Sequence, residues 1–499
     1  MIFQNSLILY IKMAIQIVIS LYTTRVILNA LGINDFGIYN LLSGAVAMFG
    51  FIRAALSSST IRFLAFSEGK GNYGEKIKVF NISIVLHLLF AVLFFILLEL
   101  GLYFFFDSIF NIEPKRIETA KLVSHFVILI SCINILIVPF EGVLNSHENM
   151  FYLSIIDLIR SLLVLIVAFS MTSTQADKLY FYVLSLLVIW IIVFGCYAVY
   201  CFLKYEECRI KFREFFDKDL AKAMLGFSSL EFFGYSSGVI SLYSTNLLIN
   251  AFFGTAVNAA QGIANQLSGQ LTSFSSTMMK AVKPALVKNE GSGNHELVQK
   301  ITFLSGKYSF LILIFFATPF LLETNYILKL WLNNVPEWTI IFCRLQIFKN
   351  CIEQFFLPFG SAIGARGNIR SYVIANSINN ILILPTVYLC FSLGFPPFSM
   401  YLVLFLFFSI FGFIINLHYG KILMNFDIKQ FLNTIVIPHI TLYLCVLFFC
   451  FLVVYTMEES SLRFLCVGVI SSISIITMAY LLMRNEEKIK LLTLLKILK

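Results

Sequence analysis

The sequence has little charge for its length. Only 13% of its 499 residues are Asp, Glu, Lys or Arg, whereas soluble domains carry about 25%. Hydrophobic residues make up 59% of the chain, and apolar runs of membrane-spanning length recur along almost all of it. This composition excludes an ordinary soluble domain. It predicts an all-α polytopic membrane protein.

Signatures of catalysis, metal binding and disulfide frameworks are also lacking. The 10 cysteines form no CxxC pair, and neither HExxH nor GxSxG occurs. The segment GKGNYGEK at 69–76 fails the phosphate-loop pattern, because Glu75 stands where lysine must follow the second glycine. We therefore expect no enzyme, no metal, no cofactor and no nucleic-acid partner.

Fourteen candidate spans can be counted, and the basic residues between them predict the topology. If the N-terminus is cytoplasmic, the cytoplasmic connections hold most of the Lys and Arg residues. The opposite side then holds only Lys115, Arg116, Lys121, Lys178, Lys329 and Arg463. This asymmetry follows the positive-inside rule and predicts a multi-pass protein with both termini in the cytoplasm. The N-terminal segment has no basic leading region or cleavage site, so we expect it to be the first span.

Two segments of the sequence recur later in the chain. VISLYTTRVILNA at 18–30 matches VISLYSTNLLINA at 239–251, and PFEGVLNSHEN at 139–149 aligns with PFGSAIGARGN at 358–368. An even number of spans separates the copies, which predicts two six-helix lobes in a parallel pseudo-two-fold repeat plus two C-terminal helices. The predicted boundaries are 1–205 for the N-lobe, 206–425 for the C-lobe with an amphipathic cytoplasmic connector before it, and 426–499 for the last two spans and a basic cytoplasmic tail.

Ionisable side chains inside the spans are the main functional signal. Each costs about 2.5–3.5 kcal/mol at a helix centre on insertion scales, so each needs a partner or a function. Lys12, Arg25 and Arg53 lie in the first two spans. Arg25 and Arg53 either line a cavity or extend to the headgroups at the membrane surface. Asp157 and Arg160, three residues apart, either neutralise each other or contribute to a site.

Two further features fall in the predicted spans of the C-lobe. Glu231 has no partner within its own helix, which makes it the best candidate for a protonatable or cation-pairing group. Gln261, Asn265 and Ser268 recur on one helical face of an unusually polar span. Such a face either forms hydrogen bonds between helices or lines an aqueous cavity suited to sugar hydroxyls.

Several segments resemble a known family. RVILNALGINDFGIYNLLSG, IRFLAFSEGKGN, PFEGVLNSHENM and NAAQGIANQLSGQLTSFSSTMMKAVKPALVKNEGSGN are similar to segments of bacterial oligosaccharide repeat-unit flippases, the polysaccharide biosynthesis transporters. Their superfamily includes multidrug and toxin extrusion (MATE) transporters and lipid II flippases. The resemblance implies a MATE-like fold in the bacterial inner membrane. It also implies a substrate, an undecaprenyl-diphosphate-linked glycan of O-antigen or capsule, and partners that include membrane lipids and a polymerase.

The resemblance also suggests site residues. Lipid II flippases carry arginines in spans 1 and 2 that are thought to meet the diphosphate, and Arg25 and Arg53 correspond by span. The usual arginine of span 8 is missing here, and only Lys280 and Lys283 near its end could replace it.

We therefore expect the diphosphate to bind Arg25, Arg53 and Lys12, helped by Lys280. The sugars should be held by Gln261, Asn265 and Ser268. Glu231 and Asp157 couple transport to a proton or sodium gradient. The alternatives are a MATE-type drug or cation antiporter on the same fold and a scaffold that transports nothing.

Overall fold

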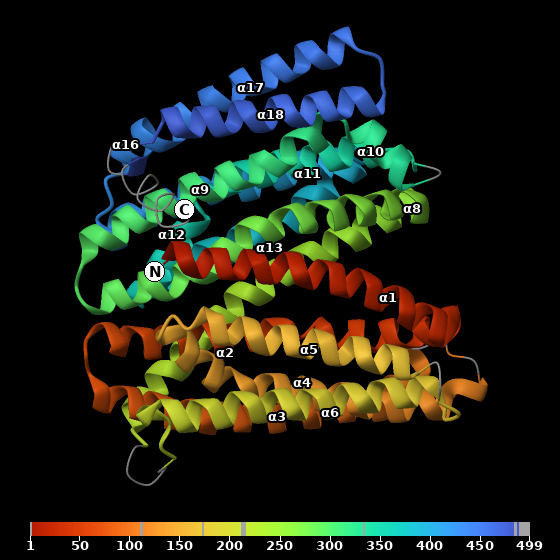
Figure 1. Cartoon of the computed structure of the whole chain (residues 1–499), viewed down its shortest axis with the longest axis vertical. Helices are drawn as coiled ribbons and strands as arrows, with labels where there is room; N and C mark the ends of the chain where they lie inside the picture. The colour runs from red at the N-terminus through yellow and green to blue at the C-terminus, as the bar shows by residue number, and fades with distance from the viewer. Residues whose placement is uncertain are drawn as a thin grey trace, which may run out of the picture. The chain divides into compact units, whose positions relative to one another are not determined.

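The computed structural model describes residues 2–109, 112, 114–171, 174–210, 216–332, 335–483 and 487–488. Throughout these ranges the regular elements are helices and no strand occurs (Figure 1). Residues 211–215 of the predicted connector, and 484–486 and 489–499 of the predicted tail, lie outside the described residues. The chain divides into two compact units. Unit 1 comprises Met1–Val239 and Lys280–His295, and unit 2 comprises Ile240–Met279 and Glu296–Lys499.

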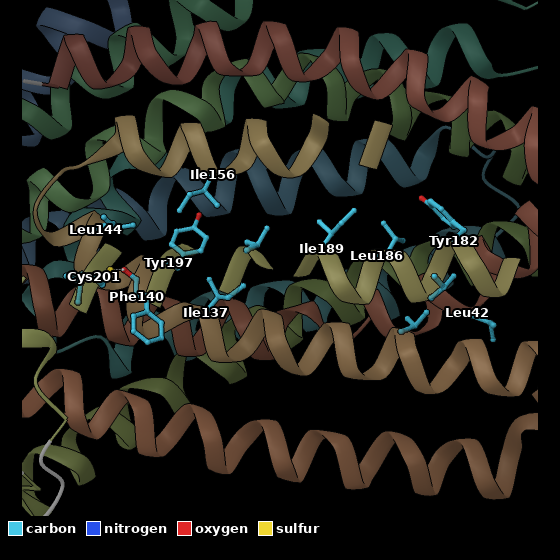
Figure 2. Packing of buried hydrophobic residues seen from close by; sticks show 14 of the residues in the cluster. Leu42, Ile137, Phe140, Leu144, Ile156, Tyr182, Leu186, Ile189, Tyr197 and Cys201 are labelled. Atoms are coloured by element: carbon cyan, nitrogen blue, oxygen red, sulfur yellow. Dashed lines mark hydrogen bonds between the residues drawn. The ribbon is translucent and has the colours of Figure 1, made fainter. Parts of the chain in front are cut away.

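Unit 1 is a bundle around one apolar core. Its helices are α1 (Ile2–Ala47), α2 (Gly50–Gly69), α3 (Tyr73–Ile109), α4 (Ile117–Ser146), α5 (Met150–Ser170), α6 (Lys178–Lys204) and the two ends of α8 (Lys218–Gly291). Two short 3₁₀ turns, η1 (Pro114–Arg116) and η2 (Glu206–Cys208), complete it. α4 packs against α2, α3 and α6, and α1 packs against α5. Phe140, Ile156 and Tyr197 belong to the core between α4, α5 and α6 (Figure 2).

Unit 2 contains the middle of α8 and the remaining helices. They are α9 (His295–Leu322), α10 (Thr324–Trp331), α11 (Thr339–Glu353), α12 (Leu357–Arg366), α13 (Arg370–Ser392), α14 (Ser399–Leu404), η3 (Phe405–Phe411), α15 (Gly412–Met424), α16 (Ile428–Phe431), η4 (Leu432–Val436), α17 (Ile437–Thr456) and α18 (Ser461–Leu481). The segments η3 and η4 are π-helical turns that continue their neighbouring helices. α17 and α18 pack side by side as a hairpin (Figure 1).

The helices account for the predicted membrane spans. Within the described residues, 10 helical segments are long and apolar enough to cross a bilayer. Four more polar helical stretches supply the other expected passes: 33–47 continued by α2, the two halves of α8, and α11 with α12. Their polarity has a structural reason, because side chains that face other helices need not match lipid.

The backbone repeats where the sequence repeats. Just after the matched segments, α1 and α8 are each interrupted at a glycine with positive φ, Gly32 (φ 77°, ψ 172°) and Gly254 (φ 80°, ψ −177°), which are one position apart in the alignment. The turn after α4 places Glu148 at φ 54°, and its counterpart in the second aligned segment, Gly367, has φ 90°. Shared left-handed positions are a property of backbone geometry and not of hydrophobicity. They confirm the duplicated architecture.

The compact units differ from the predicted lobes. Both ends of α8 pack within unit 1, so residues 218–239 and 280–295 group with the N-terminal helices. The boundaries at 205/206 and 425/426 describe repeats in the sequence. That the segments between these boundaries act as functional lobes stays a prediction.

Candidate substrate-binding and ion-coupling site

Four charged side chains from four helices meet inside unit 1. Lys12 on α1 forms an ion pair with Asp157 on α5. The Arg53 guanidinium on α2 donates a hydrogen bond to Oε2 of Glu141 on α4 at 2.7 Å. Lys12 and Asp157 both act electrostatically on Glu141, so the two pairs are neighbours. We call these four residues the charge tetrad.

Helix packing fixes the tetrad. Gln16 lies one turn after Lys12 on α1 and donates to the carbonyl oxygen of Asp157 and to Oγ of Ser161, each at 3.3 Å. The Arg53 Nε donates to the carbonyl oxygen of Asn134 on α4 at 3.1 Å. Two cations therefore lie beside two carboxylates, and the tetrad carries no formal net charge. An anion that binds Lys12 or Arg53 must compete with these carboxylates.

Asp157 has a closer partner than the one in its own helix. The Arg160 Nε is 4.0 Å from Oδ1 of Asp157, and the Arg160 guanidinium lies 5.2 Å from the ring centre of Trp190. The neutralisation within α5 that spacing suggested is therefore secondary to the contact with Lys12. Charges of both tetrad carboxylates also act on Tyr197 of α6, whose ring lies near Ile156 of α5 (Figure 2).

Glu231 belongs to a second charged cluster in unit 1. Lys283 is the largest opposite charge acting on it, and Ser58 and Arg62 of α2 add a hydrogen bond and a further positive charge. The Lys283 Nζ donates to Oγ of Ser58 at 3.1 Å. Lys283 lies near the far end of α8, so reversal of the chain at Gly254 brings it back to Glu231. We call Glu231, Lys283, Ser58 and Arg62 the α2/α8 cluster.

Two predicted cations are exposed. Arg25 on α1 and Lys280 on α8 are open to their surroundings, and neither has an ion pair with any residue that the structure describes. Arg25 is thus available to an anionic ligand in a way that Lys12 and Arg53 are not. Whether it meets substrate or lipid headgroups stays a prediction.

Of the polar residues in the second half of α8, some pack against other helices and others are exposed. Ser268 is buried in unit 2 and accepts a hydrogen bond from Nδ2 of Asn350 on α11. Gln261 is buried and donates to Sδ of Met400 at 3.6 Å, while its Oε1 has no partner among the described residues. Asn265 is exposed. Hydrogen bonding between helices therefore accounts for Ser268, whereas a role of Gln261 and Asn265 in holding sugars stays a prediction.

Sequence inspection missed Glu141, the partner of Arg53. It lies in PFEGVLNSHEN, a segment already singled out for its repeat, and Gly360 occupies the aligned position. A charge present in one copy and absent from the other was therefore a usable signal. Lys283 was considered as a substitute arginine, but no pattern connected it with Glu231.

A third cluster lies where α6 ends, and its Glu207 is outside the apolar spans. Glu207 of η2 is 2% exposed, accepts a hydrogen bond from Nε2 of His147, and lies 3.0 Å from the Lys76 ammonium. Burial by itself would raise the pKa of Glu207. The bonds from His147, from its own backbone N–H and from Lys76 outweigh burial and bring that pKa to about 2. This cluster ties α3 and α4 to the end of α6.

Solved structures with a similar arrangement of helices are transporters. A mutant of a MATE transporter superposes with a TM-score of 0.75 at 15% identity, covering 85% of this chain and 95% of that chain. An outward-facing multidrug resistance MATE family transporter of the MOP superfamily gives 0.70 at 15% identity, with the same coverage. A MOP superfamily transporter from Pyrococcus furiosus, described as having a binding pocket of reverse polarity, gives 0.69 at 15% identity, again with 85% and 95% coverage. The fold is that of MATE transporters.

The family follows from the sequence. The model of the polysaccharide biosynthesis protein family matches residues 2–290, more than half of the chain. The protein therefore belongs to the polysaccharide biosynthesis protein family, and the resemblance noted from its segments is confirmed. A search of curated proteins found no match.

Proposed function

We propose that this protein is a flippase that moves undecaprenyl-diphosphate-linked oligosaccharide repeat units, of O-antigen or capsule, from the cytoplasmic to the periplasmic leaflet of the bacterial inner membrane. Membership in the polysaccharide biosynthesis family is the observation that carries this proposal. The MATE fold supports alternating access as the mechanism. Both termini lie in the cytoplasm, the chain itself catalyses no reaction, and a polymerase takes up the product on the periplasmic side.

Arg25 makes the first contact with the diphosphate in this proposal. It is exposed on α1 and has no ion pair within the described residues, and a guanidinium can bind two phosphate oxygens at once. Lys280 contributes a second exposed cation. Arg53 and Lys12 then bind the diphosphate by exchanging their carboxylate partners for phosphate oxygens.

This exchange gives a route to ion coupling. When phosphate displaces Asp157 from Lys12, the carboxylate keeps only its longer contact with Arg160, at 4.0 Å. Taking up a proton or a sodium ion then lowers the free energy of that state. Glu231 offers the same chemistry in the α2/α8 cluster, since Lys283 is its main counter-charge. Substrate and coupling ion thus compete through shared ion pairs.

The sugars are held by uncharged groups. Asn265 presents an exposed amide on α8. Gln261 and Ser268 are buried there and offer further hydrogen-bonding atoms once Gln261 becomes accessible and Ser268 releases Asn350. Glycans have many hydroxyls, so amides and hydroxyls suit them.

Purified protein in liposomes tests the proposal. A fluorescent polyprenyl-diphosphate-linked oligosaccharide in the outer leaflet should become protected from a membrane-impermeant quencher only when the protein is present. Arg25→Ala should reduce the initial rate at least tenfold. Arg209→Ala, which removes an exposed arginine from the surface pair with Glu206, is the matched control and should leave the rate unchanged. Equal rates for the wild type and Arg25→Ala would reject the role of Arg25, and no flipping by the wild type would reject the flippase.

The second candidate is a drug or cation antiporter, favoured by the likeness to a multidrug resistance MATE transporter. It predicts uptake of a lipophilic fluorescent cation into the same liposomes under a proton or sodium gradient. The tetrad is neutral, but the exposed Arg25 disfavours a cationic substrate in its neighbourhood, because like charges repel each other. Cation uptake without glycan flipping would establish this alternative, and neither activity would support the scaffold.

A further inference from the structure

The ends of α2 and α8 touch through two glycines in unit 1. A Cβ placed on Gly69 would collide with the carbonyl oxygen of Lys288, and one placed on Gly291 would collide with the carbonyl oxygen of Phe66. Both hypothetical contacts are closer than the 3.0 Å that real Cβ atoms respect. Glycine lets two helix backbones approach this closely, and Cα–H groups then contact carbonyl oxygens directly. We call this contact the glycine crossing.

The two helix ends are copies of each other. α2 ends in SEGKGN at 67–72 and α8 ends in NEGSGN at 289–294, an equivalence that the two longer matches did not include. Asn72 N donates to the Ser67 carbonyl at 3.1 Å, and Asn294 N donates to the Asn289 carbonyl at 3.0 Å. The glycine that ends each turn has positive φ, 66° at Gly71 and 77° at Gly293. Both helices thus stop with the same Schellman-type cap.

The contact is also reciprocal. In the alignment of the two caps, Phe66 corresponds to Lys288 and Gly69 corresponds to Gly291. Gly69 packs on Lys288, and Gly291 packs on Phe66, so the two contacts join equivalent residues in opposite directions. Such a pattern is the signature of a two-fold axis, here a local pseudo-two-fold axis between repeats. The glycine crossing lies on that axis.

Charges flank the crossing on both sides. Oε1 of Glu68 is 3.9 Å from the Lys288 ammonium. Glu290, one residue before its glycine like Glu68, acts electrostatically on Arg62 of α2. Each cap therefore places a glutamate next to a cation of the other helix, and these pairs add attraction to the backbone contact.

We propose that the glycine crossing is the closed cytoplasmic gate of this transporter, and that α2 and α8 must separate at Gly69 and Gly291 whenever the cytoplasmic entrance opens. The positive-inside asymmetry assigns this end of both helices to the cytoplasm. Rocking of one repeat against the other has to change a contact on their shared axis. Backbone packed on backbone has no flexible side chain that could adapt, so the contact is either made or broken. This inference rests on the proposed alternating access and is independent of which substrate is carried.

Distance measurements between spin labels test the gate without any substrate. Labels would replace Lys70 and Ser292, the residues that follow the two helices, through Lys70→Cys and Ser292→Cys in a background without the 10 native cysteines. The wild-type glycines should give a dominant short distance. Gly69→Ala and Gly291→Ala should each lower the short-distance population at least threefold in favour of a longer distance.

Two alanine variants serve as matched controls. Gly195→Ala on α6 adds a Cβ with nothing within 4 Å, so it should leave the distance distribution unchanged. Gly420→Ala on α15 adds a Cβ against the ring of Phe359 in unit 2, so it should lower stability without changing the distribution. An unchanged distribution in Gly69→Ala and Gly291→Ala, or an equal shift in Gly195→Ala, would overturn the proposal.

Cross-linking tests the gate with both glycines intact, which covers the case in which the alanine variants fail to fold. A short cleavable cross-linker between the cysteines of Lys70→Cys and Ser292→Cys should reduce glycan flipping at least tenfold, and cleavage should restore it. Full flipping by cross-linked protein would overturn the gate. If even the uncross-linked protein moves no glycan, the proposed function fails, and the spin-label distances still decide whether the gate exists.

Discussion

The two repeats differ in charge at the tetrad. When the sequence matches are extended along each helix, the tetrad residues of the first copy align with uncharged residues of the second. The pairs are Lys12 with Phe233, Arg53 with Ser275, Glu141 with Gly360, and Asp157 with Asn376. At two of these positions the second copy forms neutral hydrogen bonds instead. Ser275 donates to the Ser309 carbonyl at 3.2 Å, and Asn376 donates to a carbonyl of its own helix at 3.1 Å.

The difference shows that duplicated helices can keep their packing and turns while their interiors diverge in charge. Gly32 and Gly254 still reverse the chain in the same way. The second copy does bury a charge pair, Lys349 with Glu353 at 2.8 Å, but both lie on one helix and at other positions. A charged network that links four helices is therefore a property of the first copy. It is this network that the substrate and the coupling ion use in the proposed mechanism.

The largest expected effect comes from breaking the tetrad. Arg53→Ala leaves the Glu141 carboxylate without its partner and should destabilise the protein by about 3 kcal/mol, the low end for a buried pair because Arg53 is partly exposed. Arg53→Ala with Glu141→Ala should recover more than half of that loss, because no uncompensated charge remains. Thermal unfolding in detergent measures both. Glycan flipping should be lost in the single and the double variant alike.

The matching change in the second copy is the control. Ser275→Ala removes only a neutral hydrogen bond and should cost about 1 kcal/mol with flipping retained. If the double variant is as unstable as Arg53→Ala, the charges are not energetically coupled, and the contrast between the copies loses its basis.

A medium effect is expected at the junction after the sixth helix of each copy. In the first copy Glu207 is held in a charged cluster, whereas after α15 Phe426 packs against Phe303 and Phe359, each 5.7 Å away between ring centres. The pKa of Glu207 is about 2 when folded and near 4.5 when unfolded. Its stabilisation is therefore complete above pH about 4.5 and disappears as the pH falls through about 2.

Hydrogen exchange can follow this difference. Residues 205–208 should lose protection as the pH falls from 5 towards 2, while residues 424–427 should keep theirs. Glu207→Gln should cost about 3 kcal/mol at pH 7 and nothing extra at the acidic end. Glu206→Gln, at the exposed neighbouring carboxylate, should behave like the wild type. Equal acid sensitivity at both junctions would remove the contrast.

The smallest effect is expected in the neutral network of unit 2. Ser268→Ala leaves Nδ2 of Asn350 buried without its acceptor and should cost about 1 kcal/mol, independently of pH between 5 and 9. The exposed Asn265→Ala should leave the unfolding temperature unchanged and reduce only glycan flipping. A pH-dependent loss in Ser268→Ala would mean that a titrating group, and not a neutral bond, governs this part of the second copy.

Much of the fold was predictable because it depends on local composition and on repetition. Long apolar runs predicted the helices, and the VISLY match predicted the repeat that Gly32 and Gly254 display. The site was predictable only in part. Lys12, Arg53 and Asp157 were recognised because a charge in a span is costly, but their partners lie on other helices, and helical spacing says nothing about contacts between helices. Glu141 and Lys283 became partners only when α4 and the end of α8 were placed beside α2.

By itself, the sequence determined a polytopic helical membrane protein with duplicated halves and with unpaired-looking charges in the first of them. Those properties follow from hydropathy, from the cost of charge in lipid and from matching segments, all of which are local. The tertiary structure decided that the charges of the tetrad pair with one another and that Arg25 forms no ion pair within the described residues. It also decided that two copied helix ends meet at Gly69 and Gly291. Such pairings depend on which helix faces join, and distant segments reach one another only through packing.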